Sequence, residues 1–524
     1  MDGRRDRRWA GAAALAVALA TAIPYILASA LARDGSHFSG LLYNPYDGFS
    51  YLAKMRQGEG GAWLFTLSYA ADPGPGTFLF VFYLFLGHLA RWMGLPRELI
   101  YHAARVLGAL AMFYLAYLFY EHSLSERRAR WAAYGLTLLG SGLGWLALTQ
   151  GVVSSDLWIP ESVPFMSAYV NAHFPFASAL LLAAVLITTR ADALAKWKYL
   201  AAILVGLLLG AIQPFALGVL MVVMGGWLLW ELFMVYRSGG LLSALRGIRT
   251  RALALLSVLA GAAPWLIYDA WVVTAHPVLK IWSAQNQTPS PVPLHYALGY
   301  GIVFVLALLG IARGRVLRES KGRLLVAWLV INALALYAPT ALQRRLSLGL
   351  YFPMAALAGP GLCSILSVSK ISRLAIVATV LLATPTNLVV ILGGLGEAQR
   401  PDSSFVISSD EMAGFRWLDE HAAPGALVLA GPRTGNRLPA YASVRVLYGH
   451  PFETPHAQEE EALVRRFYAW ADAPEDALTL LQARGIDFVV YGPEERALGK
   501  PAWLASLPGA FRAGSLAIYA VPTP

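Results

Sequence analysis

The chain has 524 residues, of which 57% are hydrophobic and only 14% are charged, and its mean hydropathy is +0.54. About a quarter of the residues in a soluble globular protein are charged, so this composition excludes a disordered, fibrous or ordinary cytosolic protein and indicates a polytopic membrane protein. The net charge of +10 does not indicate a nucleic-acid partner, because basic residues of membrane proteins collect in cytoplasmic loops. Cys363 is the single cysteine, so no disulfide can form within the chain.

The N-terminus carries several arginines ahead of an apolar run from Trp9 to about Leu31. A run of about 22 residues suits a membrane span. The alternative is a cleaved signal peptide, because Ala28-Ser29-Ala30 resembles a cleavage site. We expect an uncleaved first helix with its arginines on the cytoplasmic side.

Further apolar runs are each close to the ~20 residues that a bilayer requires. They fall near residues 78–95, 99–121, 131–150, 172–189, 197–213, 215–236, 252–275, 294–313, 323–341, 346–368 and 372–395. Gln213-Pro214 separates two of these runs, because proline breaks a helix, and Gln213 is also a candidate polar lining at the break. Residues 1–396 are therefore predicted to form a transmembrane domain of about 11–13 helices.

Basic residues orient the loops from residue 122 onward. The clusters expected inside lie at 127–130, 190–198, 237–251, 313–323 and 370–373. The loops 151–171 and 276–293 carry almost no basic residues and are expected outside, and the alternation also places the C-terminal region outside.

The count of spans conflicts with this topology. An inside N-terminus and an outside C-terminus need an odd number of spans, whereas the apolar runs give an even number. Either the run at 78–95 does not fully cross, or the loop at 122–130 breaks the charge rule, or a weak span is missed.

Two regions are expected outside the spans. Residues 32–77 form a long first outer loop, in which the pattern from Phe49 to Met55 predicts a short helix on the membrane surface. After about Glu397, β-like runs alternate with helical patterns, which predicts an α/β domain over residues 397–524. The expected strands are 426–430, 488–491 and 516–521, and the expected helices are 409–421, 457–471 and 475–484.

Asp47, early in the first outer loop, is the first candidate for chemistry. A carboxylate near the bilayer surface suits a general base or a metal ligand. The structural alternative is that Asp47 caps a helix that begins at Gly48 or Phe49.

Asp156 and Glu161 lie together in the second outer loop and, with Asp47, offer the carboxylate oxygens that Mg²⁺ or Mn²⁺ prefers. The structural alternative is that Asp156 and Glu161 are solvated loop charges. Asn171 and His173 precede the next span, where the histidine suits a phosphate or a metal, or a satisfied position at the interface.

Arg344 and Arg345 lie between two spans on the outer side, where guanidinium groups suit a lipid-linked phosphate or simply reach to headgroups. Lys54 and Lys280 are weaker candidates of the same type. His450 and Glu453, within GHPFETP (449–455), suit a metal or sugar site, or a structural loop. No zinc motif, P-loop, G-x-S-x-G or G-x-G-x-x-G spacing is present, and the glycines of GSGLGW (140–145) indicate close helix packing.

Taken together, these features resemble the GT-C superfamily of polytopic glycosyltransferases, which includes protein O-mannosyltransferases, aminoarabinose transferases and oligosaccharyltransferase catalytic subunits. The resemblance rests on a first span, a long outer loop with an early acid in NPYDGFSYLAKMRQG (44–58), the number of spans and the C-terminal outer α/β domain. Further segments resemble a group of bacterial GT-C-like membrane proteins, namely DLWIPE (156–161), NAHFP (171–175), RRLSLG (344–349) and YGHPFETP (448–455).

The resemblance implies sugar transfer from a polyprenyl-phosphate donor to a glycan, lipid or protein acceptor of the cell envelope, on the outer face of a bacterial inner membrane. Asp47 would deprotonate the acceptor or help to hold a divalent metal (Mg²⁺ or Mn²⁺), and Asp156 or Glu161 would be the second-loop acid. Arg344 or Arg345 would hold the donor phosphate. His173, Asn171, Lys54 and Gln213 would be further substrate contacts.

Two other functions remain open on the sequence. A lipid or polymer transporter, or flippase, would favour internal repeats and intramembrane charges, whereas the ionisable residues here lie mainly in loops. A non-catalytic lipid-sugar-binding protein with the same fold is the other alternative, because Asp47 is followed by glycine where many GT-C members carry an acidic pair.

Overall fold

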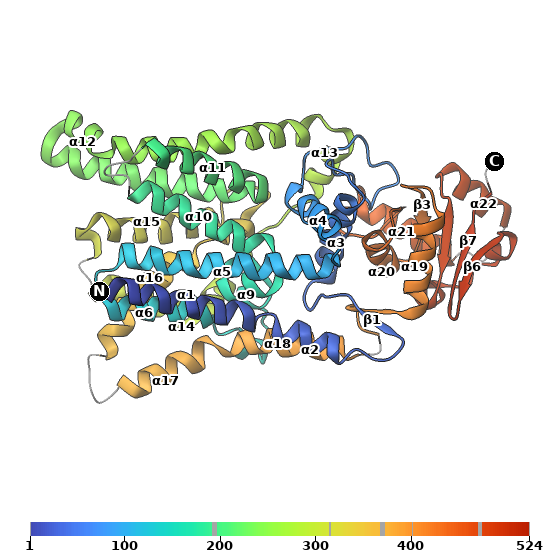
Figure 1. Cartoon of the computed structure of the whole chain (residues 1–524), viewed down its shortest axis with the longest axis horizontal. Helices are drawn as coiled ribbons and strands as arrows, with labels where there is room; N and C mark the ends of the chain where they lie inside the picture. The colour runs from blue at the N-terminus through green and yellow to red at the C-terminus, as the bar shows by residue number, and fades with distance from the viewer. Residues whose placement is uncertain are drawn as a thin grey trace. The chain divides into compact units, whose positions relative to one another are not determined.

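The computed structural model describes residues 2–190, 196–313, 316–366, 372–400, 402–469 and 474–522 (Figure 1). The chain divides into two compact units. The helical unit comprises Met1–Ile23, His102–Tyr268 and Thr288–Gly393, and the mixed unit comprises Pro24–Tyr101, Asp269–Gln287 and Gly394–Pro524. Arg315, Lys370 and the last two residues of the helix expected at 457–471 lie outside the described residues.

Apolar segments form the helices that belong mostly to the helical unit. These are α1 (Asp2–Ala20), α5 (Arg97–Ser123), α6 (Arg127–Leu139), α7 (Gly144–Leu148), α8 (Ser155–Trp158), α9 (Pro164–Val170), α10 (His173–Thr189), α11 (Lys196–Ile212), α12 (Pro214–Ala275), α14 (Pro293–Arg313), α15 (Ser320–Ala335), α16 (Tyr351–Leu366), α17 (Ser372–Ala383) and α18 (Pro385–Ala398), with 3₁₀ turns η1 (Pro160–Ser162), η2 (Val316–Arg318) and η3 (Gln343–Ser347). In Figure 1, α1 lies beside α5, to which it is joined by an ion pair between Arg7 and Glu121.

Small residues allow these helices to approach closely. A Cβ atom on Gly310 of α14 would lie 2.0 Å from the carbonyl oxygen of Leu357, and one on Gly361 of α16 would lie 2.0 Å from that of Leu306. In the same way Gly142 packs against the backbone of Leu298 and Gly299. Close packing of this kind is how membrane helices associate. Gly142 of GSGLGW does approach α14 closely, but it lies between α6 and α7 rather than within a helix.

Seven described helical segments are long and apolar enough to cross a membrane. One of them, α12, holds two of the expected runs, because Gly240 at φ 75° interrupts the helix and turns it back on itself (Figure 1). The runs expected at 78–95, 172–189, 197–213 and 323–341 form helices of 13, 17, 17 and 16 residues. The polytopic helical fold is confirmed, and the exact number of spans stays a prediction.

A five-stranded sheet with the order β4-β3-β5-β7-β6 organises the C-terminal part of the mixed unit. Its strands are β3 (Leu427–Leu429), β4 (Arg445–Val446), β5 (Phe488–Tyr491), β6 (Gly509–Ala513) and β7 (Leu516–Ala520). β3 pairs in parallel with β4 and β5, and β7 pairs antiparallel with β5 and β6. Val428 is paired with Val446 and Phe488, and Val490 with Ile518. The three expected strands are confirmed, and β4 and β6 are additional.

The helices of the mixed unit are α2 (Ile23–Ala30), α3 (Pro45–Glu59), α4 (Val81–Met93), α13 (Pro277–Gln285), α19 (Ser409–His421), α20 (Pro432–Arg437), α21 (Ala457–Ala469), α22 (Pro474–Ala483) and α23 (Pro493–Leu498), with 3₁₀ turns η4 (Leu438–Ala440) and η5 (Ala502–Ser506). The expected helices therefore correspond to α19, α21 and α22. The apolar faces of α21 and α22 bury Leu429 and Val489 of the sheet with Phe467 of α21 and Leu481 of α22.

The first outer loop belongs to this same unit. β1 (Ser36–Phe38) pairs antiparallel with β2 (Val406–Ser408), which ties the loop to the start of the C-terminal segment. The expected surface helix is part of the longer α3, whose residues 48–55 are buried. Gly58 and Gly87 let α3 and α4 touch, because a Cβ on either would lie 2.0 Å from a carbonyl oxygen of the other helix.

Candidate active site

α3 places Asp47 in its first turn. The helix begins at Pro45, where proline is favoured because the first helical position needs no backbone N–H donor, and Asn44 precedes it at φ 38°. Asp47 is therefore not the cap of a helix that begins at Gly48 or Phe49, and that alternative is wrong. A carboxylate in the first turn also interacts favourably with the positive end of the helix dipole.

Two side chains hold the Asp47 carboxylate. Asn44 Nδ2 donates to Oδ2 at 2.6 Å, and His450 Nε2 lies 3.2 Å from Oδ1. The side chain is nevertheless 32% exposed. The carboxylate is thus oriented at both oxygens and still accessible from solvent.

The backbone around His450 fixes which nitrogen of its ring carries the proton. The N–H groups of Phe452 and Glu453 both donate to His450 Nδ1, each at 3.1 Å. An Nδ1 that accepts hydrogen bonds carries no proton, so the neutral ring has its proton on Nε2. That N–H donates to Asp47. His450 is therefore a hydrogen-bond donor to the candidate base.

A buried ion pair holds the same loop against α3. Lys54 Nζ lies 2.8 and 2.9 Å from the two carboxylate oxygens of Glu453, and Ser50 Oγ donates to Glu453 Oε1 at 2.6 Å. Lys54 is only 1% exposed and lies 4.3 Å from the centre of the Phe80 ring. Burial raises the pKa of the Glu453 carboxyl, but the Lys54 charge and these hydrogen bonds outweigh burial and hold that pKa below its ordinary value.

Aromatic rings surround His450. Tyr46 and Tyr69 have ring centres 6.0 and 5.8 Å from that of His450. The hydroxyl of Tyr69 donates to the carbonyl of Asn436 at 3.0 Å. Burial, with the charges of Glu453 and Asp47, raises the pKa of Tyr69 well above its ordinary value, so this phenol remains a neutral donor.

Asp156, in the helical unit, is buried and fully engaged in hydrogen bonds. Oδ2 accepts from the N–H groups of Gly142 and Gly144 at 2.9 and 3.2 Å, and Oδ1 accepts from Ser154 Oγ at 2.5 Å. Burial raises its pKa, and these hydrogen bonds offset part of that rise. A Cβ on Gly144 would lie 2.6 Å from Oδ1. Asp156 thus organises the glycine-rich segment, and it is not a solvated loop charge.

Glu161 and Arg345 form a second cluster in the helical unit. Arg345 Nη1 donates to Glu161 Oε1 at 2.9 Å, and the two side chains are 23% and 3% exposed. The Arg345 guanidinium also lies 6.0 Å from the ring centres of Phe174 and Phe215, and Arg344 lies 4.9 Å from that of Trp158. Glu161, like Asp156, is therefore buried rather than solvated.

The remaining candidates are buried polar residues of the helical unit. His173 is the first residue of α10, and its ring centre lies 4.1 Å from that of Phe174. Asn171 directly follows the last residue of α9, and Gln213 lies between α11 and α12. Their roles in substrate binding stay predictions.

The carboxylates that were expected to bind a metal are not arranged as metal ligands. Asp156 directs both carboxylate oxygens to N–H or O–H donors, and Glu161 is paired with Arg345. Across the described ranges, no group of three His, Cys, Asp or Glu residues is placed to hold a metal ion. We therefore assign no step to Mg²⁺ or Mn²⁺.

Sequence reasoning missed the partners of Asp47. Asn44 and His450 were not assigned to it, and Ser50 was not singled out. The spacing of Asp47, Ser50 and Lys54 places them on one face of a helix, which is the signal that was available. Their contacts with residues 450 and 453 join segments far apart in sequence, for which no local pattern exists.

No protein-family model matches the chain, and no curated protein is similar to it in sequence. Its fold does match solved structures. The arabinofuranosyltransferase AftD from Mycobacteria superposes with a TM-score of 0.61 and 15% identity, over 99% of this chain and 40% of that one.

This chain covers a larger share of two other solved structures. AglB, an oligosaccharyltransferase from Archaeoglobus fulgidus in complex with an inhibitory peptide and a dolichol-phosphate, gives a TM-score of 0.55 and 11% identity over 98% of this chain and 74% of that one. ArnT from Cupriavidus metallidurans, bound to undecaprenyl phosphate, gives 0.53 and 12% identity over 97% of both chains. These are GT-C glycosyltransferases, so the expected GT-C fold is confirmed.

Proposed function

We propose that this chain is a membrane glycosyltransferase that moves a sugar from a polyprenyl-phosphate donor to an acceptor of the cell envelope, with Asp47 as the general base. The fold supports the reaction class, because two of the similar structures hold a dolichol-phosphate or undecaprenyl phosphate. A fold alone does not establish an activity, so the proposal depends on the site.

The observation that carries the proposal is the arrangement of Asp47. A general base must be held in a fixed orientation and still be reachable by its substrate. Asn44 and His450 hold one carboxylate oxygen each, and the side chain remains 32% exposed. The other candidate acids of the sequence, Asp156 and Glu161, are both buried.

In the proposed step, Asp47 takes the proton from the acceptor nucleophile. The nucleophile's lone pair forms the new bond to the anomeric carbon of the donor sugar, while the bond from that carbon to the phosphate oxygen breaks. The electrons of the broken bond leave with the lipid-linked phosphate, and the sugar passes through an oxocarbenium-like state.

The departing phosphate gains negative charge, which cationic side chains stabilise. We assign this role to Arg344 and Arg345, two residues of η3 whose guanidinium groups lie over the rings of Trp158 and Phe174. Asn171, His173 and Gln213 are proposed contacts of the substrate. Lys54, which was predicted to bind substrate, is placed in a buried ion pair, so we assign it a positioning role instead.

The proposed location is a bacterial inner membrane, with the mixed unit on the extracytoplasmic side. This follows the alternation of basic residues between loops. The proposal does not include a metal, because Asp156 already accepts hydrogen bonds at both oxygens and Glu161 is paired with Arg345. A similar structure, an Archaeoglobus fulgidus oligosaccharyltransferase, holds Zn and sulfate, so the experiment also includes addition of a metal.

The proposal is tested by transfer assays with purified protein and a panel of synthetic polyprenyl-phosphate sugars. Asp47→Asn keeps the shape of the side chain and removes the base, so we expect transfer to fall by about 100-fold or more. Asp34→Asn is the matched control, because Asp34 is an exposed aspartate of the same loop.

Equal transfer by wild type and Asp47→Asn would remove Asp47 from the chemistry. Absence of transfer from every donor would contradict the proposed activity. Movement of the intact donor between leaflets of proteoliposomes, without transfer, would favour a flippase. Stimulation by Mn²⁺ or Mg²⁺ that EDTA reverses would restore the metal to the mechanism.

A further inference from the structure

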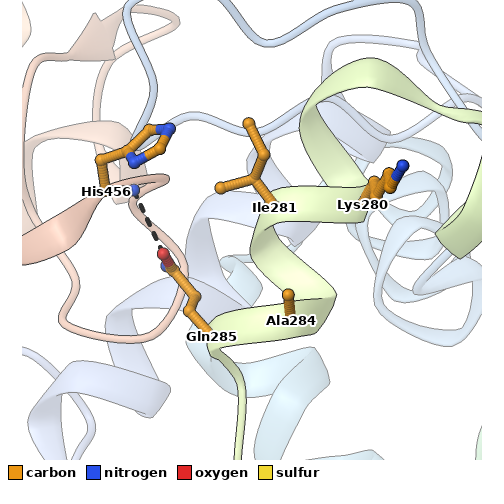
Figure 2. A pocket seen from close by; sticks show the side chains of 5 residues that line it. All are labelled: Lys280, Ile281, Ala284, Gln285 and His456. Atoms are coloured by element: carbon orange, nitrogen blue, oxygen red, sulfur yellow. Dashed lines mark hydrogen bonds between the residues drawn. The ribbon is translucent and has the colours of Figure 1, made fainter.

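α13 contacts the loop that carries His450 through one side chain. Gln285, the last residue of α13, donates from Nε2 to the carbonyl oxygens of Phe452 (3.3 Å) and Thr454, and its Oε1 accepts from the N–H of His456 at 3.1 Å (Figure 2). Every hydrogen bond described between α13 and residues 449–456 goes through Gln285. The amide thus acts as both donor and acceptor along one strip of backbone.

The same strip of backbone determines the state of His450. The N–H groups that fix its Nδ1 belong to Phe452 and Glu453, and the carbonyls bound by Gln285 belong to Phe452 and Thr454. A peptide unit is planar, so fixing the carbonyl of Phe452 also fixes the direction of the N–H of Glu453. Gln285 therefore restrains a donor that holds the proton of His450 on Nε2.

The loop ends at a residue with an unusual backbone conformation. His456 has φ 55°, in the left-handed region that residues other than glycine rarely adopt. Its exposed side chain lines an open hollow of about 460 Å³ together with Lys280, Ile281, Ala284 and Gln285 (Figure 2). The hydrogen bond from its N–H to Gln285 is what ties this conformation to α13.

We propose that Gln285 is a positioning residue for the base, acting through residues 449–456 and His450 to orient the carboxylate of Asp47. The inference rests on the proposed function for its effect on activity. Its structural part concerns only the order of the loop and the donation from His450, and it can be measured separately.

Gln285→Glu is the discriminating variant, because it keeps the size of the side chain and its acceptor but loses the N–H donors. Gln287→Glu is the matched control, because it introduces the same charge two residues away at an exposed side chain. The described hydrogen bond of that side chain runs from Nε2 to the carbonyl of Ala284 at 3.4 Å. Hydrogen–deuterium exchange of the peptide covering 449–456 should increase in Gln285→Glu and remain at the wild-type level in Gln287→Glu.

In the transfer assay, Gln285→Glu should lower kcat about tenfold and leave the KM for the acceptor unchanged, because misplacement of a base affects the chemical step. In a His450→Ala background the same substitution should cause no further loss, since residues that act through one another are not additive. Gln287→Glu should keep wild-type kinetics in both backgrounds.

Unchanged exchange over 449–456 in Gln285→Glu would overturn the inference whether or not the protein transfers sugar. An equal, additive loss of kcat in the wild-type and His450→Ala backgrounds would overturn it as well. If wild type transfers nothing, the proposed function fails, and the exchange data alone still decide whether Gln285 orders the loop.

Discussion

Asp47 in the mixed unit and Asp156 in the helical unit both lie in segments that are predicted to be outer loops. Each accepts hydrogen bonds at both carboxylate oxygens. They differ in what surrounds them. Asp156 is buried among backbone N–H groups of a glycine-rich segment, whereas Asp47 is held by two side chains and remains about one-third exposed. A carboxylate enclosed by backbone donors stabilises the fold, and one oriented by side chains at a surface is available for chemistry.

Glu453 and Glu495 extend the comparison within the mixed unit. Glu453 is enclosed by Lys54 and Ser50, and Glu495 accepts from the backbone N–H groups of Gly431 and Gly492. We call Glu453, Glu495 and Asp156 the enclosed acids. Changes to them should alter stability, and changes to Asp47 should alter activity.

The largest effect on stability is expected at the ion pair. Lys54→Met leaves the Glu453 carboxylate buried without its cation, so we expect a loss of about 3–5 kcal/mol in the free energy of unfolding. Thermal unfolding of the purified protein measures it. The double variant Lys54→Met with Glu453→Gln should recover much of the loss, and a double variant no better than Lys54→Met would contradict this account.

Glu495 should give the mixed unit a pH-dependent stability. Burial and the neighbouring Glu494 raise its pKa from 4.5 to about 7. Between these values the folded state keeps a proton that the unfolded chain has lost, so this contribution is full below about pH 4.5, falls as the pH rises and is gone above about pH 7. The total change is on the order of 3 kcal/mol.

The measurement is the melting temperature of wild type and Glu495→Gln from pH 5 to pH 8. The variant has no titrating group at this position, so the difference between the two proteins should change with pH in the predicted direction. A constant difference would show that the backbone N–H donors keep Glu495 ionised throughout.

Asp156→Ala should lower stability by about 1–3 kcal/mol, because it removes the acceptor of two buried N–H groups. Asp156→Asn keeps an acceptor and should have a smaller effect, with transfer per folded molecule close to wild type. A well-folded Asp156→Asn protein without activity would indicate that Asp156 takes part in the reaction, and it would support the metal hypothesis.

The smallest stability change is expected for Asp47→Asn. The carboxylate is partly exposed, and its interaction with the first turn of α3 is worth less than about 1 kcal/mol. Its melting temperature should therefore stay close to that of wild type while transfer is lost. A large fall in melting temperature would place Asp47 among the enclosed acids.

Local patterns accounted for much of the fold. The strands near Val428, Val489 and Ile518 were predicted from short β-like runs, and the helix from Ser409 to His421 from helical periodicity. The structure contains all four elements. The start of α3 was also readable, because Asn44-Pro45 is a typical helix beginning. The capping interpretation of Asp47 overlooked that signal.

The candidate site was only partly predictable. Asp47, His450 and Glu453 were singled out by residue type, but the hydrogen bond from His450 to Asp47 joins positions 403 residues apart. Asp156 can be buried because the backbone N–H groups of Gly142 and Gly144 donate to its carboxylate. The residue types alone do not predict this contact. Contacts of these kinds arise from tertiary packing, so a single sequence carries no direct record of them.

The two N–H groups directed at His450 Nδ1 have a consequence for the path of the proton in the proposed reaction. With that nitrogen occupied, the imidazole cannot pass a proton from one ring nitrogen to the other, so no relay leads from Asp47 through the ring into the protein. In the proposed reaction, the proton taken from the acceptor would leave from the exposed side of the carboxylate. Turnover would then depend on how quickly the acceptor product departs and lets water return to Asp47.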